Sequence, residues 1–223
     1  MTKRTAKTIS TVSRTVPDLT FETKAMNAGH ALVAGVDEAG RGPWAGPVVA
    51  AAVILDPKSI PVGLNDSKAL TPYRRETLFT ELKASGALIA VGIADARRID
   101  QMNILQATFW AMQEAISALP QAPSMALIDG NRAPRTKIQT RTIVGGDALC
   151  LSISAASIIA KVTRDRIMFD LAHAHPGYGF DKHKGYGTPQ HQAALAKLGP
   201  CSEHRRSFRP VALAFGGLKI IPG

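Results

Sequence analysis

The sequence is poor in cysteine and in aromatic residues, and it has no long apolar run. Its two cysteines, Cys150 and Cys201, lie far apart and form no CxxC pair. This spacing argues against a structural zinc ribbon and suits a reducing compartment. No apolar stretch is long enough to cross a bilayer, and none follows the basic N-terminal residues as a secretory signal would require. We therefore expect a cytoplasmic protein without membrane association. We also expect a monomer, since nothing in the sequence demands an interface.

Acidic residues are scarce relative to basic ones. The chain of 223 residues has 27 Lys and Arg against 17 Asp and Glu, which gives a formal net charge of +10 at pH 7. An excess of this size favours polyanionic partners, because each neutralised phosphate releases counterions. A basic surface can also serve solubility alone. Charge by itself therefore leaves nucleic acid as one of two interpretations.

The first 28 residues differ in composition from the rest of the chain. They are rich in Thr, Ser and Lys, carry five basic side chains against two acidic ones, and lack a sustained apolar period. We expect a disordered basic tail over residues 1–28, acting as a loose tether to nucleic acid or as an idle extension. Residues 29–223 are expected to form a single domain, which is long enough to bury a core without disulfides.

Apolar patterns in this domain predict alternating strands and helices. Strands are predicted over residues 31–36, 48–55, 87–93, 125–128 and, more weakly, 138–144. Helices are predicted from Pro72 onward and over residues 98–118, 151–173 and 188–198, with a glycine-rich basic loop over 175–188. This mixture indicates an α/β domain whose mixed sheet is covered by helices.

Four acidic residues stand where carboxylates are costly. They adjoin three predicted buried elements, and they are Asp37, Glu38, Asp129 and Asp147. Carboxylates that converge from separate elements repel one another, and divalent cations with a preference for oxygen ligands, such as Mg²⁺ or Mn²⁺, relieve that repulsion. Each acid also has an ordinary alternative, as a turn residue or a helix cap. Together with the basic surface, the acids predict a metal-assisted phosphodiester site.

The turn at residues 39–46, AGRGPWAG, is a candidate for contact with a ligand. Its glycines, among them Gly40 and Gly42, let the backbone approach a bound molecule closely. Arg41 between them could present its guanidinium and backbone amides to a sugar-phosphate. The spacing is not that of a dinucleotide fingerprint. A tight hairpin with a solvated arginine is the alternative.

The basic loop at residues 175–188 is a second candidate. Its sequence, HPGYGFDKHKGYGT, interleaves aromatic with basic side chains, namely Tyr178 and Tyr186 with Lys182, His183 and Lys184. Aromatic faces stack on sugars or bases while lysines meet phosphates. A plain surface loop is the alternative, and the nearby His173 and His175 are only a weak indication of zinc.

These segments resemble, in order, the motifs of the ribonuclease HII family. The opening segment VDEAGRGPWAGPVVAAAVIL at 36–55 looks like the family's first signature. The similarity continues through NDSKALT (65–71), NILQAT (103–108), LIDGN (127–131), ISAASIIAKVTRDR (153–166), HKGYGT (183–188) and HRRSF (204–208). Ribonuclease HIII is disfavoured, because that sister family carries Lys in place of Arg41 and an additional N-terminal domain.

The resemblance implies a fold and an activity. The fold would be ribonuclease H-like, a mixed central β-sheet flanked by helices with a helical C-terminal part. The activity would be endonucleolytic hydrolysis of the RNA strand of RNA–DNA hybrids, and nicking 5′ to single ribonucleotides in duplex DNA. Both reactions would leave 3′-hydroxyl and 5′-phosphate ends. RNA–DNA hybrid and ribonucleotide-containing duplex DNA would be the partners.

The resemblance also implies roles for individual residues. The four acids, Asp37, Glu38, Asp129 and Asp147, fall on the family's catalytic metal ligands and would hold two Mn²⁺ or Mg²⁺ ions. Gly40, Arg41 and Gly42 fall on the motif that reads the ribose 2′-hydroxyl, and Tyr186 falls on the tyrosine that packs against the sugar at the RNA-to-DNA junction. We further predict phosphate contacts by Lys68, Lys182 and Lys184.

Two other functions stay open at this point. A non-catalytic nucleic-acid-binding protein could use the same basic surface, although its buried acids would repel a phosphate backbone. Another two-metal nuclease of the same broad fold, such as an integrase or a junction resolvase, is the second alternative. Metal-dependent cleavage separates the first from a nuclease, and substrate choice separates the second.

Overall fold

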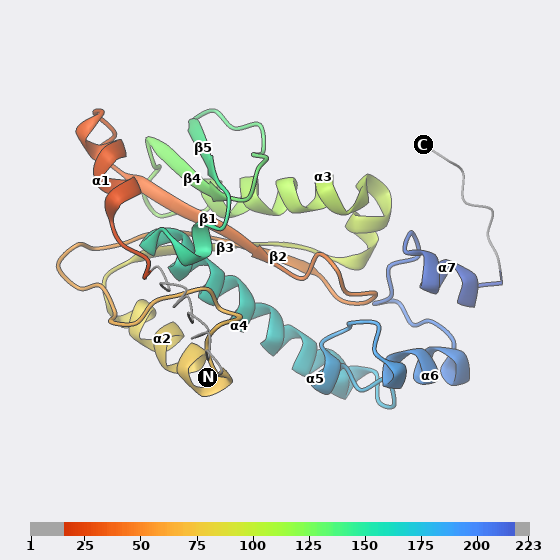
Figure 1. Ribbon diagram of the computed structural model, residues 1–223. Helices are drawn as coiled ribbons and strands as arrows, with labels where there is room; N and C mark the ends of the chain where they lie inside the picture. The colour runs from red at the N-terminus through yellow and green to blue at the C-terminus, as the bar shows by residue number, and fades with distance from the viewer. Residues whose placement is uncertain (1–15, 217–223) are drawn as a thin grey trace, which may run out of the picture.

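The computed structural model describes residues 16–216 and contains a five-stranded sheet with helices on both faces (Figure 1). The strands are β1 (Val33–Ala39), β2 (Val48–Ile54), β3 (Leu88–Ala94), β4 (Met125–Asp129) and β5 (Gln139–Ile143). They lie in the order β3-β2-β1-β4-β5, with antiparallel pairing across β3, β2 and β1 and parallel pairing across β1, β4 and β5. The predicted mixed sheet is confirmed.

The helices occupy the segments that the apolar periodicity predicts, with several additions. They are α1 (Thr20–Asn27), α2 (Pro72–Ala84), α3 (Ala96–Ser117), α4 (Leu151–Ala174), α5 (Phe180–His183), α6 (Pro189–Leu198) and α7 (Arg209–Ala214). A short 3₁₀ turn, Gly146–Ala148, precedes α4. The helix expected to run without interruption over 98–118 is broken at Asn103, where φ is +65°. None of the helices in residues 16–216 is long and apolar enough to cross a membrane.

Small residues bring α4 into direct contact with β1. A β-carbon added at Gly35 would lie 2.1 Å from the carbonyl carbon of Ser152 in the first turn of α4. No larger residue therefore fits at this point without moving the helix. Alanines of β2 bury themselves on both sides, Ala51 against α2 and α4 and Ala50 against α3. This close packing places the N-terminal end of α4 over β1, beside the acidic residues.

The strand predicted over residues 31–36 is longer than its apolar run. β1 continues through Asp37 and Glu38, which pair with Ala51 and Ala50 of β2. The prediction placed these acids after the strand, because charged residues are rare within buried strands. The hydrogen bonds between β1 and β2 are made by backbone groups and do not depend on side-chain charge, so the pairing continues through both acids. Adjacent strand residues point to opposite faces, and Asp37 and Glu38 therefore face different helices.

The expected disordered tail over 1–28 is wrong in its second half. Residues 20–27 form α1, and Asp18 pairs with Cys150 in an isolated parallel bridge. Glu22 of α1 is buried, and its Oε1 accepts hydrogen bonds from the backbone N–H of Ser152 at 2.7 Å and from the thiol of Cys150 at 3.2 Å. Glu22 thus satisfies a free amide at the start of α4. Residues 1–15 of the predicted tail lie outside the described residues.

Glu22→Ala is expected to lower the free energy of unfolding by about 1–3 kcal/mol, because it leaves the buried backbone N–H of Ser152 without its acceptor. The midpoint of thermal unfolding should fall by roughly 2–4 °C for each kcal/mol. Glu22→Gln keeps an acceptor oxygen and should lose less. Circular dichroism during heating measures both variants, and equal midpoints for wild type and Glu22→Ala would contradict the role.

Candidate active site

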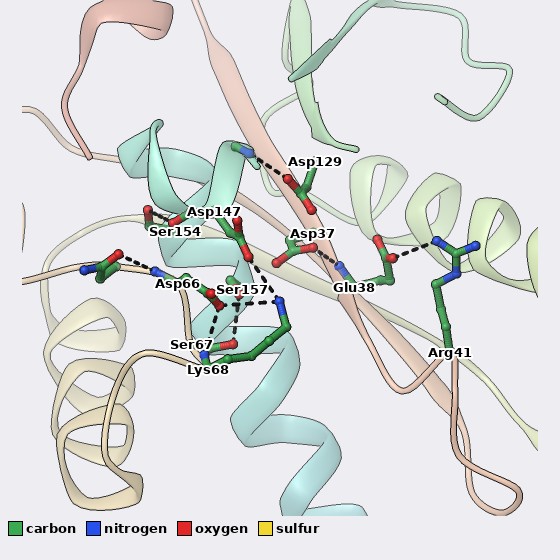
Figure 2. A network of polar contacts seen from close by, with 12 residues as sticks. Asp37, Glu38, Arg41, Asp66, Ser67, Lys68, Asp129, Asp147, Ser154 and Ser157 are labelled. Carbon is green, nitrogen blue, oxygen red and sulfur yellow. Dashed lines mark hydrogen bonds and ion pairs between the residues drawn. The ribbon is translucent and has the colours of Figure 1, made fainter. Parts of the chain in front are cut away.

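Three acidic side chains meet at the edge of the sheet. Carboxylate oxygens of Asp37, Asp129 and Asp147 lie within 4.8 Å of one another (Figure 2). Asp37 comes from β1, Asp129 from the end of the parallel strand β4, and Asp147 from the 3₁₀ turn before α4. Asp129 accepts a hydrogen bond from the backbone N–H of Gly146 at 2.7 Å, which ties β4 to that turn. These three residues are called the acidic group below.

The acidic group is costly in the absence of a cation. Burial raises the pKa of Asp37 well above its usual range, and the nearby charges of Glu38 and Asp129 raise it further. Burial also raises the pKa of Asp147, with Asp129 adding to the shift. Both shifts have the causes expected of carboxylates held together out of water. A set of hard oxygen donors in this state fits a divalent cation such as Mg²⁺ or Mn²⁺.

Lys68 partly neutralises the acidic group. Its ammonium lies 3.2 Å from Oδ2 of Asp147 and 3.5 Å from Oδ1 of Asp66. Partial burial alone would lower the pKa of Lys68, but Asp147, Asp66 and Asp37 together raise it. Its side chain is 76% exposed, so it can also meet a ligand from solvent. The structure therefore places Lys68 beside the acids, with most of its side chain open to solvent.

Glu38 lies apart from the acidic group. Its side chain projects to the other face of β1, where its Oε1 lies 3.3 Å from Nη1 of Arg41 (Figure 2). Burial raises the pKa of Glu38, while the guanidinium of Arg41 opposes this and Asp129 reinforces it. Glu38, Arg41 and Asp129 line a common hollow with Asn131 and Arg132. Asp129 is thus the residue that joins Glu38 to the other acids.

The glycine-rich turn and the basic loop, two separate candidates in the sequence, are in contact in the structure. We call residues 40–47, between β1 and β2, the glycine turn. At Gly40 the backbone has φ of +98°, a conformation that favours glycine. A β-carbon added at Gly42 would lie 3.7 Å from the ring of Tyr186, which is 48% exposed. The turn and this tyrosine therefore form one continuous surface.

A family model described as ribonuclease HII matches residues 34–211 of the chain. The chain belongs to the ribonuclease HII family. Its curated relatives include ribonuclease HII of Parvibaculum lavamentivorans, 59% identical over 88% of this chain and 72% of the relative. Another is ribonuclease HII of Azorhizobium caulinodans, 55% identical over 91% of this chain and 78% of the relative. Membership makes the chain a ribonuclease H, an enzyme that cleaves the RNA strand of RNA–DNA hybrids.

Solved structures agree with this assignment. Ribonuclease H2 of Pyrococcus horikoshii matches with a TM-score of 0.69 and 30% identity, over 82% of this chain and 96% of that one. Ribonuclease HII of Archaeoglobus fulgidus, solved in complex with PCNA, matches with a TM-score of 0.66 and 26% identity, over 78% and 93% of the two chains. The predicted ribonuclease H-like fold is therefore confirmed.

Two buried arginines support the glycine turn of this ribonuclease HII family member. Arg164 of α4 donates to the carbonyl oxygens of Pro47, Ala45 and Lys184. Arg205 donates to carbonyl oxygens within the same turn and is completely buried. Burial lowers the pKa of Arg164 to about 10 and that of Arg205 to about 9. Neither residue stands out in the sequence, although they lie in the KVTRDR and HRRSF segments, because arginines are usually exposed.

The basic loop differs from its expected form in two respects. Tyr178 is buried and stacks on Phe180, with ring centroids 5.2 Å apart, so its proposed stacking on nucleic acid is wrong. Lys182 and Lys184 line an open hollow beside α2 and α4, away from the acidic group. The ammonium of Lys184 donates to the carbonyl of Asp181. The two tyrosines of this loop therefore differ in environment, since Tyr178 lies in the core and Tyr186 at the surface.

A chain of neutral histidines holds the backbone of Tyr186 from behind. The N–H of Cys201 lies 3.0 Å from Nδ1 of His204, which must accept. Nε2 of His204 therefore donates to Nε2 of His191 at 3.1 Å. Nδ1 of His191 in turn donates to the carbonyl of Tyr186 at 3.0 Å. This arrangement requires both rings to be uncharged.

Acidification is expected to destabilise the C-terminal part through His204. Burial lowers the pKa of His204 from 6.5 to about 4, and neighbouring histidines, His191 foremost, add to the shift. His204 also faces the rings of Tyr178 and Phe180. In the unfolded chain His204 becomes protonated below about pH 6.5, whereas in the folded chain it stays neutral down to about pH 4. Stability should therefore fall across that interval, by up to about 3 kcal/mol.

Urea unfolding at several pH values between 7.5 and 4.5 measures this loss. The control is His204→Phe, which keeps a buried ring but cannot titrate. The acidic group titrates in both proteins, so it cancels in their difference. An identical pH dependence in wild type and His204→Phe would contradict the prediction.

Proposed function

We propose that this ribonuclease HII family member nicks duplex DNA on the 5′ side of a single embedded ribonucleotide, as well as cleaving the RNA strand of hybrids. The products would carry 3′-hydroxyl and 5′-phosphate ends. The observation that carries the proposal is the convergence of Asp37, Asp129 and Asp147 within 4.8 Å beside the glycine turn and Tyr186. The carboxylates that would hold the catalytic metal ions and the groups that would contact the sugar thus lie together at one end of the strands.

The acidic group would hold two Mn²⁺ or Mg²⁺ ions, with Glu38 approaching from the other side of Asp129. When bound, such ions lower the pKa of a water that attacks phosphorus and stabilise the charge of the leaving oxygen. The carboxylates act as ligands, so none is required as a general base. Lys68 stands 3.2 Å from Asp147, where it can neutralise a substrate phosphate or the acids themselves. The 2′-hydroxyl is a recognition feature in this proposal, and no cyclic phosphate should form.

The glycine turn and Tyr186 would recognise the ribonucleotide. Within residues 16–216 the backbone N–H groups of Arg41 and Gly42 have no hydrogen-bond acceptor, so they are free to bind a ligand. Tyr186 would pack its exposed ring against the adjacent sugar. A deoxynucleotide would leave donors of the turn unpaired, and a site of this kind rejects the analogue that lacks the hydroxyl.

A non-catalytic nucleic-acid-binding protein is the function that this proposal must exclude. The buried acidic group argues against it, because three carboxylates without cations would repel a phosphate backbone. A basic surface alone would account for binding but not for these acids.

The deciding experiment uses a DNA duplex with one embedded ribonucleotide, incubated with protein and Mn²⁺ or Mg²⁺. Controls contain EDTA or an all-DNA duplex. A single nick 5′ to the ribonucleotide, seen only with metal, is the expected result. Cleavage restricted to long hybrids would overturn the single-ribonucleotide claim, and binding of folded protein without any cleavage would overturn the catalytic one.

A further inference from the structure

We propose that Arg205 is a positioning residue that sets the backbone amides of the glycine turn for recognition of the 2′-hydroxyl. This inference rests on the proposed reading of the ribose by Gly40, Arg41 and Gly42, and it adds a residue from the far end of the chain to that function. Arg205 does not touch the substrate in this proposal. It acts through the turn.

All three nitrogen atoms of the Arg205 guanidinium donate hydrogen bonds to the glycine turn. Its Nε donates to the carbonyl of Gly46 at 3.0 Å, its Nη1 to the carbonyl of Arg41 at 2.9 Å, and its Nη2 to the carbonyl of Gly40. Two of the three acceptors are thus residues of the proposed recognition motif. The third is the glycine that closes the turn. A planar fork that meets three carbonyls fixes their relative orientation as well as their distance.

Peptide geometry turns this anchorage into a presentation of donors. The carbonyl of Gly40 and the N–H of Arg41 belong to one peptide unit, and in a trans unit they point in opposite directions. The same holds for the carbonyl of Arg41 and the N–H of Gly42. No cis peptide occurs in the described part of the chain. Carbonyls drawn inward to Arg205 therefore aim the two N–H groups away from it, and these are the amides that have no acceptor within residues 16–216.

The charge of Arg205 has no ion pair to satisfy. Its side chain is 0% exposed, and no carboxylate of residues 16–216 lies within 4.0 Å of it. A buried cation is costly unless hydrogen bonds compensate for lost solvent. Here that compensation comes from the carbonyls of the turn. If the turn moved, the buried charge of Arg205 would lose these hydrogen bonds. That cost holds the glycine turn in its observed conformation.

The backbone around Arg205 is itself held to the turn. The N–H of Arg205 donates to the carbonyl of Trp44 at 2.8 Å, and the N–H of Gly46 donates to the carbonyl of Glu203 at 2.9 Å. Next along the chain, the carboxylate of Asp100 accepts from the backbone N–H groups of Arg206 and Ser207, each at 2.9 Å. The C-terminal segment thus delivers Arg205 at a fixed depth below the turn.

The test compares Arg205→Lys with wild type in two assays. The first is kcat/KM on a duplex with one ribonucleotide, and the second is inhibition of that reaction by an all-DNA duplex of the same sequence. Lysine keeps the charge but cannot supply three coplanar donors. We expect kcat/KM to fall by about 10- to 100-fold, as for a small misplacement of a recognition group. The inhibition constant of all-DNA duplex should stay within about twofold, because phosphate contacts are unchanged.

Two further variants separate positioning from general destabilisation. Leu82→Ala opens a cavity in the core cluster between α2 and α4, which does not include Arg205. It should lower the free energy of unfolding without lowering kcat/KM. Asp100→Ala loosens the segment that carries Arg205 without touching its fork, and should lower kcat/KM in the same direction but less. Asp100→Ala also keeps the inference testable if Arg205→Lys fails to fold.

The outcomes distinguish this inference from the proposed function. Wild-type kcat/KM in Arg205→Lys and Asp100→Ala, with a loss in Gly42→Pro, which removes the backbone N–H of Gly42, would overturn the inference and leave the proposed reading of the ribose in place. Wild-type kcat/KM in Gly42→Pro as well would overturn that reading itself. Equal losses in Arg205→Lys and in Leu82→Ala at similar stability would reduce Arg205 to a purely structural residue, which also overturns the inference.

Discussion

Asp37→Asn is expected to abolish cleavage while leaving the chain folded. Asp37 is one of the three residues of the acidic group, so the substitution removes one of the carboxylates that would hold the metal ions. Loss of a direct ligand should cost more than the roughly 10- to 100-fold typical of residues that only support one. The repulsion among the acids falls at the same time, because burial and two neighbouring carboxylates already disfavour the charged form of Asp37. The thermal unfolding midpoint should therefore stay constant or rise.

Cleavage of the single-ribonucleotide duplex in saturating Mn²⁺ and a thermal unfolding curve check both halves of this prediction. Glu114→Gln is a suitable control, since it removes one negative charge from an exposed position on α3. That control should retain wild-type activity. A folded Asp37→Asn protein with full activity would show that the acidic group is not the site of the reaction.

Tyr186→Ala is expected to weaken cleavage at a single ribonucleotide far more than it weakens duplex binding. The ring of Tyr186 is exposed beside Gly42, where it can pack on a sugar, whereas its backbone is fixed by His191. Packing of an aromatic ring on a nucleotide is worth about 1–3 kcal/mol. The rate should therefore fall by about ten- to a hundredfold. Binding depends chiefly on phosphate contacts and should change little.

Cleavage rates and binding by fluorescence anisotropy, measured on the same duplex, separate these effects. Tyr186→Phe keeps the ring and should retain most of the activity. Tyr73→Ala removes a more exposed tyrosine from α2 and should change neither measurement. Parallel losses of cleavage and binding in Tyr186→Ala would contradict a role in discrimination.

The order of the elements could be predicted from the sequence because apolar periodicity reports directly on burial. The strands β2, β3, β4 and β5 and the helices α4 and α6 lie within two residues of the predicted segments, and α2 begins at the predicted Pro72. Helix α1 could not be found in this way. It is short and polar, and Glu22 is buried only because the start of α4 offers hydrogen-bond donors to it. Such a compensation joins residues 130 positions apart and leaves no local pattern.

The acids of the site were visible in the sequence, and the family resemblance led us to expect them in one site, but no local pattern shows that they meet. An acidic residue next to a buried strand signals a cost wherever it occurs, so Asp37, Asp129 and Asp147 could be singled out one by one. Whether they meet depends on the parallel pairing of β1 with β4 and on the position of α4 over β1. The alternation of β1 then separates Glu38 from Asp37 and pairs it with Arg41.

The sequence by itself determined the class of fold, the basic character of the chain and its membership of the ribonuclease HII family, because these depend on composition, local period and ordered motifs. Only the tertiary structure decided which residues hold the glycine turn and the backbone of Tyr186 in place. Arg205 and the histidine pair His191 and His204 resemble ordinary basic residues in the sequence. They acquire their roles because folding removes them from water, and a polar group without water must bind whatever backbone lies beside it.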